Sequence, residues 1–145
     1  MAERTAQHYS NHTRLHPLFH MFLLPVAGIN ILAAAWHLFR HPGLWAAWFV
    51  ILALAGATAI VMIRTYALKV QDRVIRLEEL LRMERLLPAP LKSRVYEITE
   101  QQFIALRFAS DGEIPTLVEK TLAGNLEPKA IKAAIQSWRP DYWRV

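Results

Sequence analysis

The sequence predicts an all-α membrane protein, in which a transmembrane helical hairpin with an extended second helix is followed by a small bundle of short helices. Residues 17–39 and 44–63 contain no Asp, Glu, Lys or Arg. Each stretch is about as long as the ~20 apolar residues that cross a ~30 Å hydrocarbon core. Within the first stretch, Pro25 removes a backbone hydrogen bond and predicts a kink. Helical periodicity then continues through residues 64–87, which hold no Gly or Pro.

The two apolar stretches are separated only by Arg40-His41-Pro42-Gly43, as a helical hairpin requires. Asn30 lies near the middle of the first span, where its amide needs a partner, so we expect it to face a neighbouring helix. In the second span, Ala53, Gly56 and Ala57 form a strip of small residues that lets helices approach closely. These four residues are predicted helix-packing positions, either within the chain or at a subunit interface.

Basic residues predict the orientation of the spans. Arg4 and Arg14 precede the first span, only Arg40 lies in the connector, and four basic residues follow the second span, namely Arg64, Lys69, Arg73 and Arg76. By the positive-inside rule both termini are cytoplasmic, and the last four side chains are predicted to meet anionic lipid headgroups. The competing interpretation is a signal peptide cleaved at residues 33–35, although the apolar run continues past that point.

The extension after the second span carries an apolar seam. Val70, Val74, Leu77 and Leu81 are spaced four, three and four residues apart, which is a heptad-like pattern. We interpret this seam as an association element, covered by the chain's own C-terminal helices or by another subunit. Glu78 and Arg82 are predicted to pair along the helix at i,i+4.

Residues 88–145 are predicted to form a small helical domain, which follows an N-terminal cytosolic segment (1–16), the hairpin (17–63) and the helical extension (64–87). Pro88 and Pro90 end the long helix. Short amphipathic helices are expected at residues 101–109, at 115–123 after an Asp111 cap, and at 129–138, with a helical turn within 91–98. Their predicted core residues are Phe103, Ile104, Leu106, Leu117, Val118, Leu122, Ile131, Ala134, Ile135 and Trp138.

Histidines are the only constellation that could hold a cofactor. His8, His12, His16 and His20 recur every four residues, and His37 and His41 repeat that spacing. His20 and His37 are candidate axial ligands of a haem or chlorin, whereas the alternatives are interfacial histidines that bind water or headgroups, and a pH sensor. Because the chain has no cysteine, it has no thiolate metal site.

Three stretches resemble one known family. They are the N-terminal Asn11-His12-Thr13-Arg14 with Pro17 and His20, residues 70–79, and residues 106–111 with Ile131-Lys132. In these the chain resembles a family of small bacterial two-span membrane proteins of unknown function. The resemblance implies a bacterial inner-membrane protein, and it implies no activity, cofactor or catalytic residue.

The sequence contains no catalytic motif, neither a glycine-rich phosphate loop nor HExxH nor a recognisable nucleophile. The formal net charge is +5, and we expect it to be concentrated beside the bilayer. Acidic residues interspersed among the basic ones argue against binding to nucleic acid. We therefore expect a non-enzymatic scaffold or accessory subunit that associates through helices, as a homo-oligomer or within a larger membrane complex. The alternative is a haem- or chlorin-binding subunit of a membrane electron-transfer or photosynthetic complex.

Overall fold

The computed structural model describes residues 8–10 and 15–141. Within these residues the chain consists of helices, turns and one isolated β-bridge, between Ala109 and Trp138. It divides into two compact units, one formed by Arg14–Leu68 and the other by Lys69–Arg144 with the N-terminal residues. The all-helical prediction is confirmed, and we describe each unit by itself.

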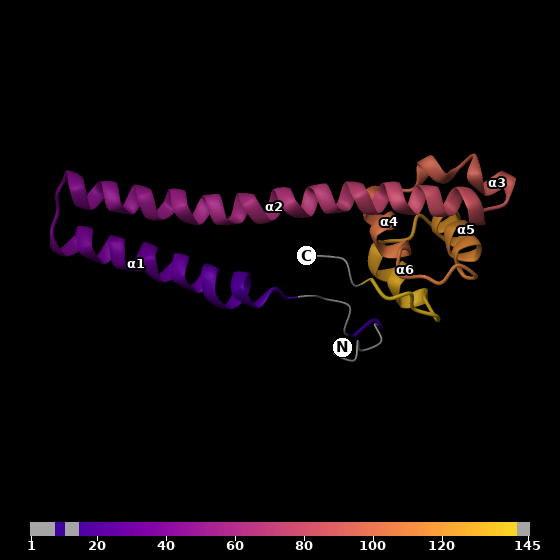
Figure 1. Ribbon diagram of the computed structural model, residues 1–145, viewed down its shortest axis with the longest axis horizontal. Helices are drawn as coiled ribbons and strands as arrows, with labels where there is room; N and C mark the ends of the chain where they lie inside the picture. Colours follow the sequence, from indigo (N-terminus) through magenta and orange to yellow (C-terminus); the bar gives the residue numbers. More distant parts are fainter. Residues whose placement is uncertain (1–7, 11–14, 142–145) are drawn as a thin grey trace. The chain divides into compact units, whose positions relative to one another are not determined.

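The first unit contains two apolar helical segments joined by a short connector. A π-helical segment, Leu18–Leu23, leads into α1, Leu24–Arg40, and α2 begins at Leu44. α1 and the first part of α2 lie side by side (Figure 1). Leu18–Arg40 and Leu44–Leu86 are both long and apolar enough to cross a membrane.

Pro25 shapes the start of α1. The sequence predicts a kink there, and the structure has a π-helical segment immediately before it, in which the Leu24 N–H donates to the Phe19 carbonyl. Proline has no N–H, and in a regular α-helix its ring would collide with the carbonyl four residues earlier, that of Met21. Widening of the preceding helix relieves this conflict.

α2 is one helix of 43 residues, Leu44–Leu86, so the predicted uninterrupted helix ends one residue early. After it, Leu87 still donates its N–H to the Met83 carbonyl, at 2.9 Å. Pro88 then takes an extended conformation with a ψ of 155°. The long helix therefore ends just before a residue that has no N–H and an extended backbone.

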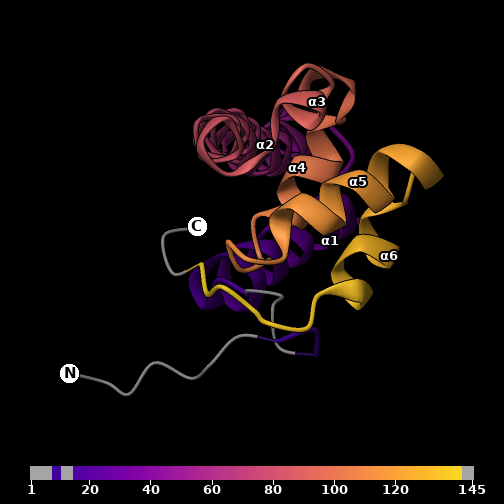
Figure 2. The same cartoon turned by 90° about the vertical axis from the view of Figure 1, so that its right-hand side faces the viewer.

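Five short helices follow and fold against one another. They are α3 (Ala89–Lys92), a 3₁₀ turn (Val95–Glu97), α4 (Glu100–Leu106), α5 (Ile114–Gly124) and α6 (Pro128–Ala134). α4 packs on both α5 and α6, and α3 packs on α5 (Figure 2). α2 contributes Met83 to the core, and Leu87 follows directly after the helix; Phe103 and Phe108 are fully buried there. The C-terminal part of α2 is thus an integral element of this domain.

Three predicted helix bounds in this domain are wrong. α4 ends at Leu106 and not at residue 109, the N-cap position of α5 is Glu113 and not Asp111, and α6 ends at Ala134 and not at residue 138. Tertiary contacts explain the differences, since Asp111 binds a side chain of α2 and Trp138 pairs with Ala109 in the β-bridge. The shortened α6 also leaves Ala134 exposed, although it was a predicted core residue.

The predicted capping box at Thr99 is confirmed, and it does more than cap α4. The Gln102 N–H donates to Thr99 Oγ1, and Gln102 Oε1 accepts from the Thr99 N–H at 2.9 Å. The amide nitrogen of the same side chain donates to the Leu126 carbonyl at 3.1 Å and to Asn125 Oδ1 at 3.3 Å. Asn125 has a φ of 43° and ends α5 in the left-handed conformation. Gln102 therefore joins the start of α4 to the end of α5.

Replacing Gln102 by alanine should lower the free energy of unfolding by about 1 to 3 kcal/mol, because a buried side chain with partners at both ends is lost. The neighbouring Gln101 is exposed, so Gln101→Ala is a matched control that should change stability by about 0.5 kcal/mol or less. Urea unfolding of the full chain in mild detergent measures both. Equal effects of the two substitutions would contradict the link between α4 and α5.

Candidate functional site

A buried cluster of charged side chains joins α2 to the C-terminal domain. Glu79 and Arg82 are only 4% and 5% exposed. The Arg82 guanidinium donates from Nε to Asp111 Oδ1 at 2.7 Å, from Nη1 to Glu79 Oε2 at 2.9 Å, and from Nη2 to the Ala109 carbonyl at 2.7 Å. One guanidinium thus binds two carboxylates and a backbone carbonyl. We call this arrangement the Arg82 clamp.

The Arg82 clamp extends to the end of the described chain. Glu79 Oε1 accepts from Arg139 Nη1 at 3.2 Å, and the Arg139 N–H donates to the Phe108 carbonyl at 2.7 Å. Close by, the buried Arg107 has its Nε 3.0 Å from Asp141 Oδ2. Buried charges are tolerated where they are paired and hydrogen-bonded. Glu79 and Arg82 meet this condition, and their contacts tie α2 to the turn after α4 and to the segment after α6.

The electrostatics of the cluster favour ionised Asp111. The hydrogen bond from Arg82 is the main cause that lowers the pKa of this carboxyl, and the nearby positive charges of Arg82, Arg139 and Arg85 lower it further. The Asp111 side chain is 67% exposed. Solvent therefore screens part of the attraction.

Beside the clamp lies an open groove of about 1090 Å³. Its walls combine apolar and charged side chains, among them Val74, Glu78, Leu81, Arg85, Pro140 and Asp141. A groove with apolar side chains and opposite charges along its edges suits the side of a helix or peptide. The site thus combines buried ion pairs that hold the fold with an open groove.

Partners of Arg82 come from two of the stretches that resemble a known family, whereas Arg82 itself lies outside both. Glu79 ends the first stretch, residues 70–79, and Arg107 and Asp111 belong to the second, residues 106–111. The structure brings these distant stretches together at one place. The shared sequence features therefore coincide with the contacts that fix the domain to α2.

A family model described as a family of unknown function (DUF6526) matches residues 1–145. The chain belongs to this family. Comparisons with curated proteins and with solved structures find no match.

The sequence did not reveal the Arg82 clamp of this DUF6526 chain. The predicted i,i+4 pair of Glu78 with Arg82 is wrong, because Arg82 binds Glu79, three residues away, together with Asp111. A clue was present, since Glu79 is an acid three residues before Arg82, a spacing at which side chains of a helix are neighbours. The second partner, Asp111, is 29 residues from Arg82, and no local pattern marks it.

The predicted association seam of α2 lies on the surface. Val70 is 62% exposed, Val74 48%, Leu77 59% and Leu81 61%. The C-terminal domain packs instead against a different face of the helix, which carries Ile75, Glu79, Arg82 and Met83. Within the part of the chain that the structure describes, the seam is therefore uncovered, and its role in association stays a prediction.

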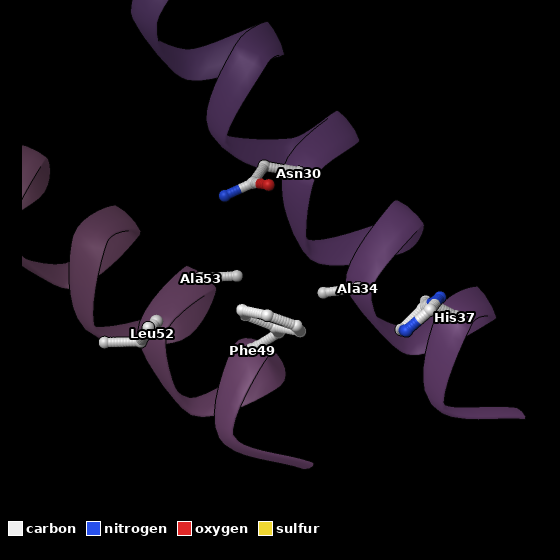
Figure 3. Close-up of a pocket in the computed structure, with 6 residues that line it drawn as sticks. All are labelled: Asn30, Ala34, His37, Phe49, Leu52 and Ala53. Atoms are coloured by element: carbon white, nitrogen blue, oxygen red, sulfur yellow. The ribbon is translucent and has the colours of Figure 1, made fainter. Parts of the chain in front are cut away.

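The predicted helix-packing residues lie in or near a groove between α1 and the first part of α2. Six side chains line this groove of about 410 Å³, namely Asn30, Ala34, His37, Phe49, Leu52 and Ala53 (Figure 3). Asn30 and Ala53 project from opposite helices toward it. Gly56 has open space where a Cβ would stand, and Ala57 is half-buried. Their role in packing is a prediction that this arrangement does not test.

The two candidate cofactor ligands occupy separate environments. His37 lines the groove, with its ring centre 6.3 Å from that of Phe49 and 5.2 Å from that of His41. His20 Nδ1 lies 3.0 Å from the carbonyl oxygen of His16. The two histidines are 17 residues apart in one continuous helical segment, so roughly 25 Å separates them along the helix axis. They cannot ligate one cofactor from both sides, and His12 lies outside the described residues.

The four predicted headgroup residues also differ in their surroundings. The Arg64 guanidinium lies 5.5 Å from the centre of the Phe19 ring. That of Arg76 lies 6.0 Å from the Phe103 ring, so this arginine covers the C-terminal core. Lys69 and Arg73 are exposed. Arg4 and Arg14 of the N-terminal segment lie outside the described residues.

Replacing Arg82 by methionine should lower the free energy of unfolding by about 3 to 5 kcal/mol, because Glu79 is then left buried without its main partner. Arg85→Met, on the exposed side of the same helical turn, is the matched control and should cost about 0.5 kcal/mol or less. Urea unfolding of the full chain in detergent gives both values. A loss below about 1 kcal/mol for Arg82→Met would show that the clamp does not hold the domain.

Replacing Asp111 by asparagine should make stability less dependent on acidic pH. Because the folded-state pKa of Asp111 is lowered, its contribution is present above the unfolded value of about 3.9 and is lost as the pH falls through the folded value. Between about pH 5 and pH 2 the unmodified chain should lose up to about 1 kcal/mol more than the variant. Urea unfolding across this range, with the exposed Glu119→Gln as control, provides the test. Parallel curves for the chain and Asp111→Asn would contradict it.

Proposed function

We propose that this protein is an integral membrane scaffold or accessory subunit that acts by helix–helix association and not by catalysis. Two spans form a transmembrane hairpin, and α2 continues into the cytosol, where the C-terminal domain is built around its end. The observation that carries the proposal is the exposure of apolar side chains, first on the two apolar helices and then along the seam of α2.

The apolar helices support insertion into a bilayer. In the most apolar stretch of Leu18–Arg40 no residue is buried by protein, and in that of Leu44–Leu86 only 11% are. Core helices of soluble proteins bury such side chains, since leaving each one in water forfeits ~1.5 to 3 kcal/mol. Large side chains such as Leu32 and Phe39 are more than two-thirds exposed. A lipid environment accounts for this exposure.

Aromatic and basic residues support the proposed orientation. Trp36, Trp45 and Trp48 surround the connector between the helices and are exposed, as expected for indoles at the headgroup level. The Arg40 guanidinium lies 5.7 Å from the Trp36 ring. Basic residues are concentrated at the other ends of the two spans, which favours cytoplasmic termini in a bacterial inner membrane.

The exposed seam, and not the buried charges, supports a role in binding. The three donor groups of Arg82 are committed to Glu79, Asp111 and the Ala109 carbonyl, so this cluster holds the fold together. The seam, in contrast, presents four large apolar side chains next to an open groove. Uncovered apolar surface of this kind marks interaction sites.

The proposed topology predicts that a reporter fused after Val145 reads the cytoplasmic side. A fluorescent protein there should be bright, and alkaline phosphatase there should be inactive, whereas phosphatase inserted between Pro42 and Gly43 should be active. Reporter activities in intact bacterial cells measure this. Active phosphatase after Val145 would overturn the orientation.

The double substitution Leu77→Glu, Leu81→Glu should lower the molecular mass of the detergent-solubilised assembly, because charged side chains cannot be buried in an apolar interface without large cost. Leu77→Met, Leu81→Met keeps apolar side chains of similar volume and should leave the mass unchanged. Light scattering measures the mass, and carbonate extraction measures membrane insertion, which neither pair should alter. An unchanged mass in the glutamate variant would remove the support for association through the seam.

A further inference from the structure

We infer that the partner of the seam is α2 of a second copy of this chain, aligned parallel, with Arg73 of each copy opposite Glu78 of the other. The inference rests on the proposed function, since membrane insertion sets the relative direction of the two helices. It specifies both the partner of the seam, a second α2, and the register in which the two helices align.

The seam has the composition of a two-stranded coiled coil. Its side chains recur at spacings of four, three and four, so they form a single stripe along about three helical turns. Valine and leucine fill these positions, and all four side chains are about half exposed or more. A stripe of this kind fits against an identical stripe, because knobs of one helix enter the holes of the other.

The charged residues on the two flanks of the seam distinguish a parallel from an antiparallel pair of helices. Arg73 directly precedes Val74 on one flank of the seam, and Glu78 directly follows Leu77 on the other flank. In a parallel pair of helices, the two flanking positions that face each other across the interface are five residues apart in the sequence. Arg73 and Glu78 have that spacing, and two-fold symmetry creates the contact twice. An antiparallel pair would instead bring like flanks together.

Both flanking side chains are available for this contact. Arg73 and Glu78 are exposed, and neither is engaged in an ion pair with another residue that the structure describes. The Arg82 clamp contributes to this, because Arg82 binds Glu79 and Asp111 and not Glu78. The charge on Glu78 is therefore exposed beside the seam.

The surface around the seam is concave. Val74, Glu78 and Leu81 form one side of the groove of about 1090 Å³, and Pro140 and Asp141 contribute to another side. A second helix that packs on the seam would thus also contact, on one flank, the segment after α6. This shape favours a helix as the occupant over a flat surface.

The bilayer selects the parallel arrangement. Two copies that insert with the same topology send α2 out of the membrane in the same direction, so the extensions run parallel. A two-fold axis along the membrane normal then relates the copies and closes the assembly as a dimer. The membrane therefore requires parallel helices, and Arg73 and Glu78 attract each other across the interface only when the helices are parallel.

Cysteine cross-linking in membrane vesicles tests the register. Because the chain contains no cysteine, Val70→Cys and the control Lys69→Cys each introduce a single thiol. In the parallel dimer, residue 70 of one copy meets residue 70 of the other, so Val70→Cys should form a disulfide-linked dimer and Lys69→Cys should form several-fold less. In an antiparallel pair, residue 70 would lie opposite residue 81, roughly 16 Å away along the axis, and Val70→Cys would not cross-link.

Charge reversal tests the pairing. In the Val70→Cys background, Arg73→Glu and Glu78→Arg should each reduce the cross-linked fraction, with a dimer dissociation constant about tenfold higher, since two attractive contacts become repulsive. The combination of both reversals should restore the dimer. Lys69→Glu, a charge reversal away from the seam, is the control and should have no effect. A partner other than this chain would not be restored by the combined reversals.

Carbonate extraction of the same vesicles separates the two proposals. Protein that stays in the membrane but shows neither the Val70→Cys cross-link nor the charge-reversal pattern would overturn the dimer and leave the membrane proposal intact. Protein released by carbonate would overturn the membrane proposal. Deleting residues 142–145 completes the test, because a cross-link that forms only after the deletion would mean that the chain's own tail occupies the seam, which overturns the dimer.

Discussion

The C-terminal domain depends on one guanidinium, that of Arg82. Its three hydrogen bonds reach Asp111, Glu79 and the Ala109 carbonyl, and Glu79 in turn accepts from Arg139. These hydrogen bonds lower the cost of burying the arginine, because a buried donor without a partner retains the cost of its removal from water. The turn after α4 and the segment after α6 are therefore fixed to the same side of α2.

This attachment determines which face of α2 remains exposed. Successive residues of an α-helix point about 100° apart, so the attached residues Ile75, Glu79 and Arg82 share one face. Val74, Leu77 and Leu81 lie on another face and stay exposed. The same few contacts that attach the domain to α2 thus leave a second apolar stripe of the helix exposed.

Sequence reasoning captured those elements whose signals are local. Pro88 marks the end of α2 to within one residue, and Thr99 with Gln102 marks the start of α4. It failed where a distant partner decides the backbone, as at Trp138, which leaves the predicted helix to pair with Ala109. It missed the Arg82 clamp for the same reason, because Glu78 and Glu79 are both within reach of Arg82 along a helix and only the fold selects between them.

A charged clamp also has a property that an apolar contact lacks. Apolar surfaces pack in several similar ways, so a domain held only by Met83 and Leu87 could rotate around α2 and cover the seam. The fork of a guanidinium is satisfied only when two carboxylates and a carbonyl stand in fixed positions. Buried ion pairs add little net stability, but they can specify one arrangement among many. In this chain the arrangement they specify leaves the seam exposed, and the association that we propose for the seam requires that exposure.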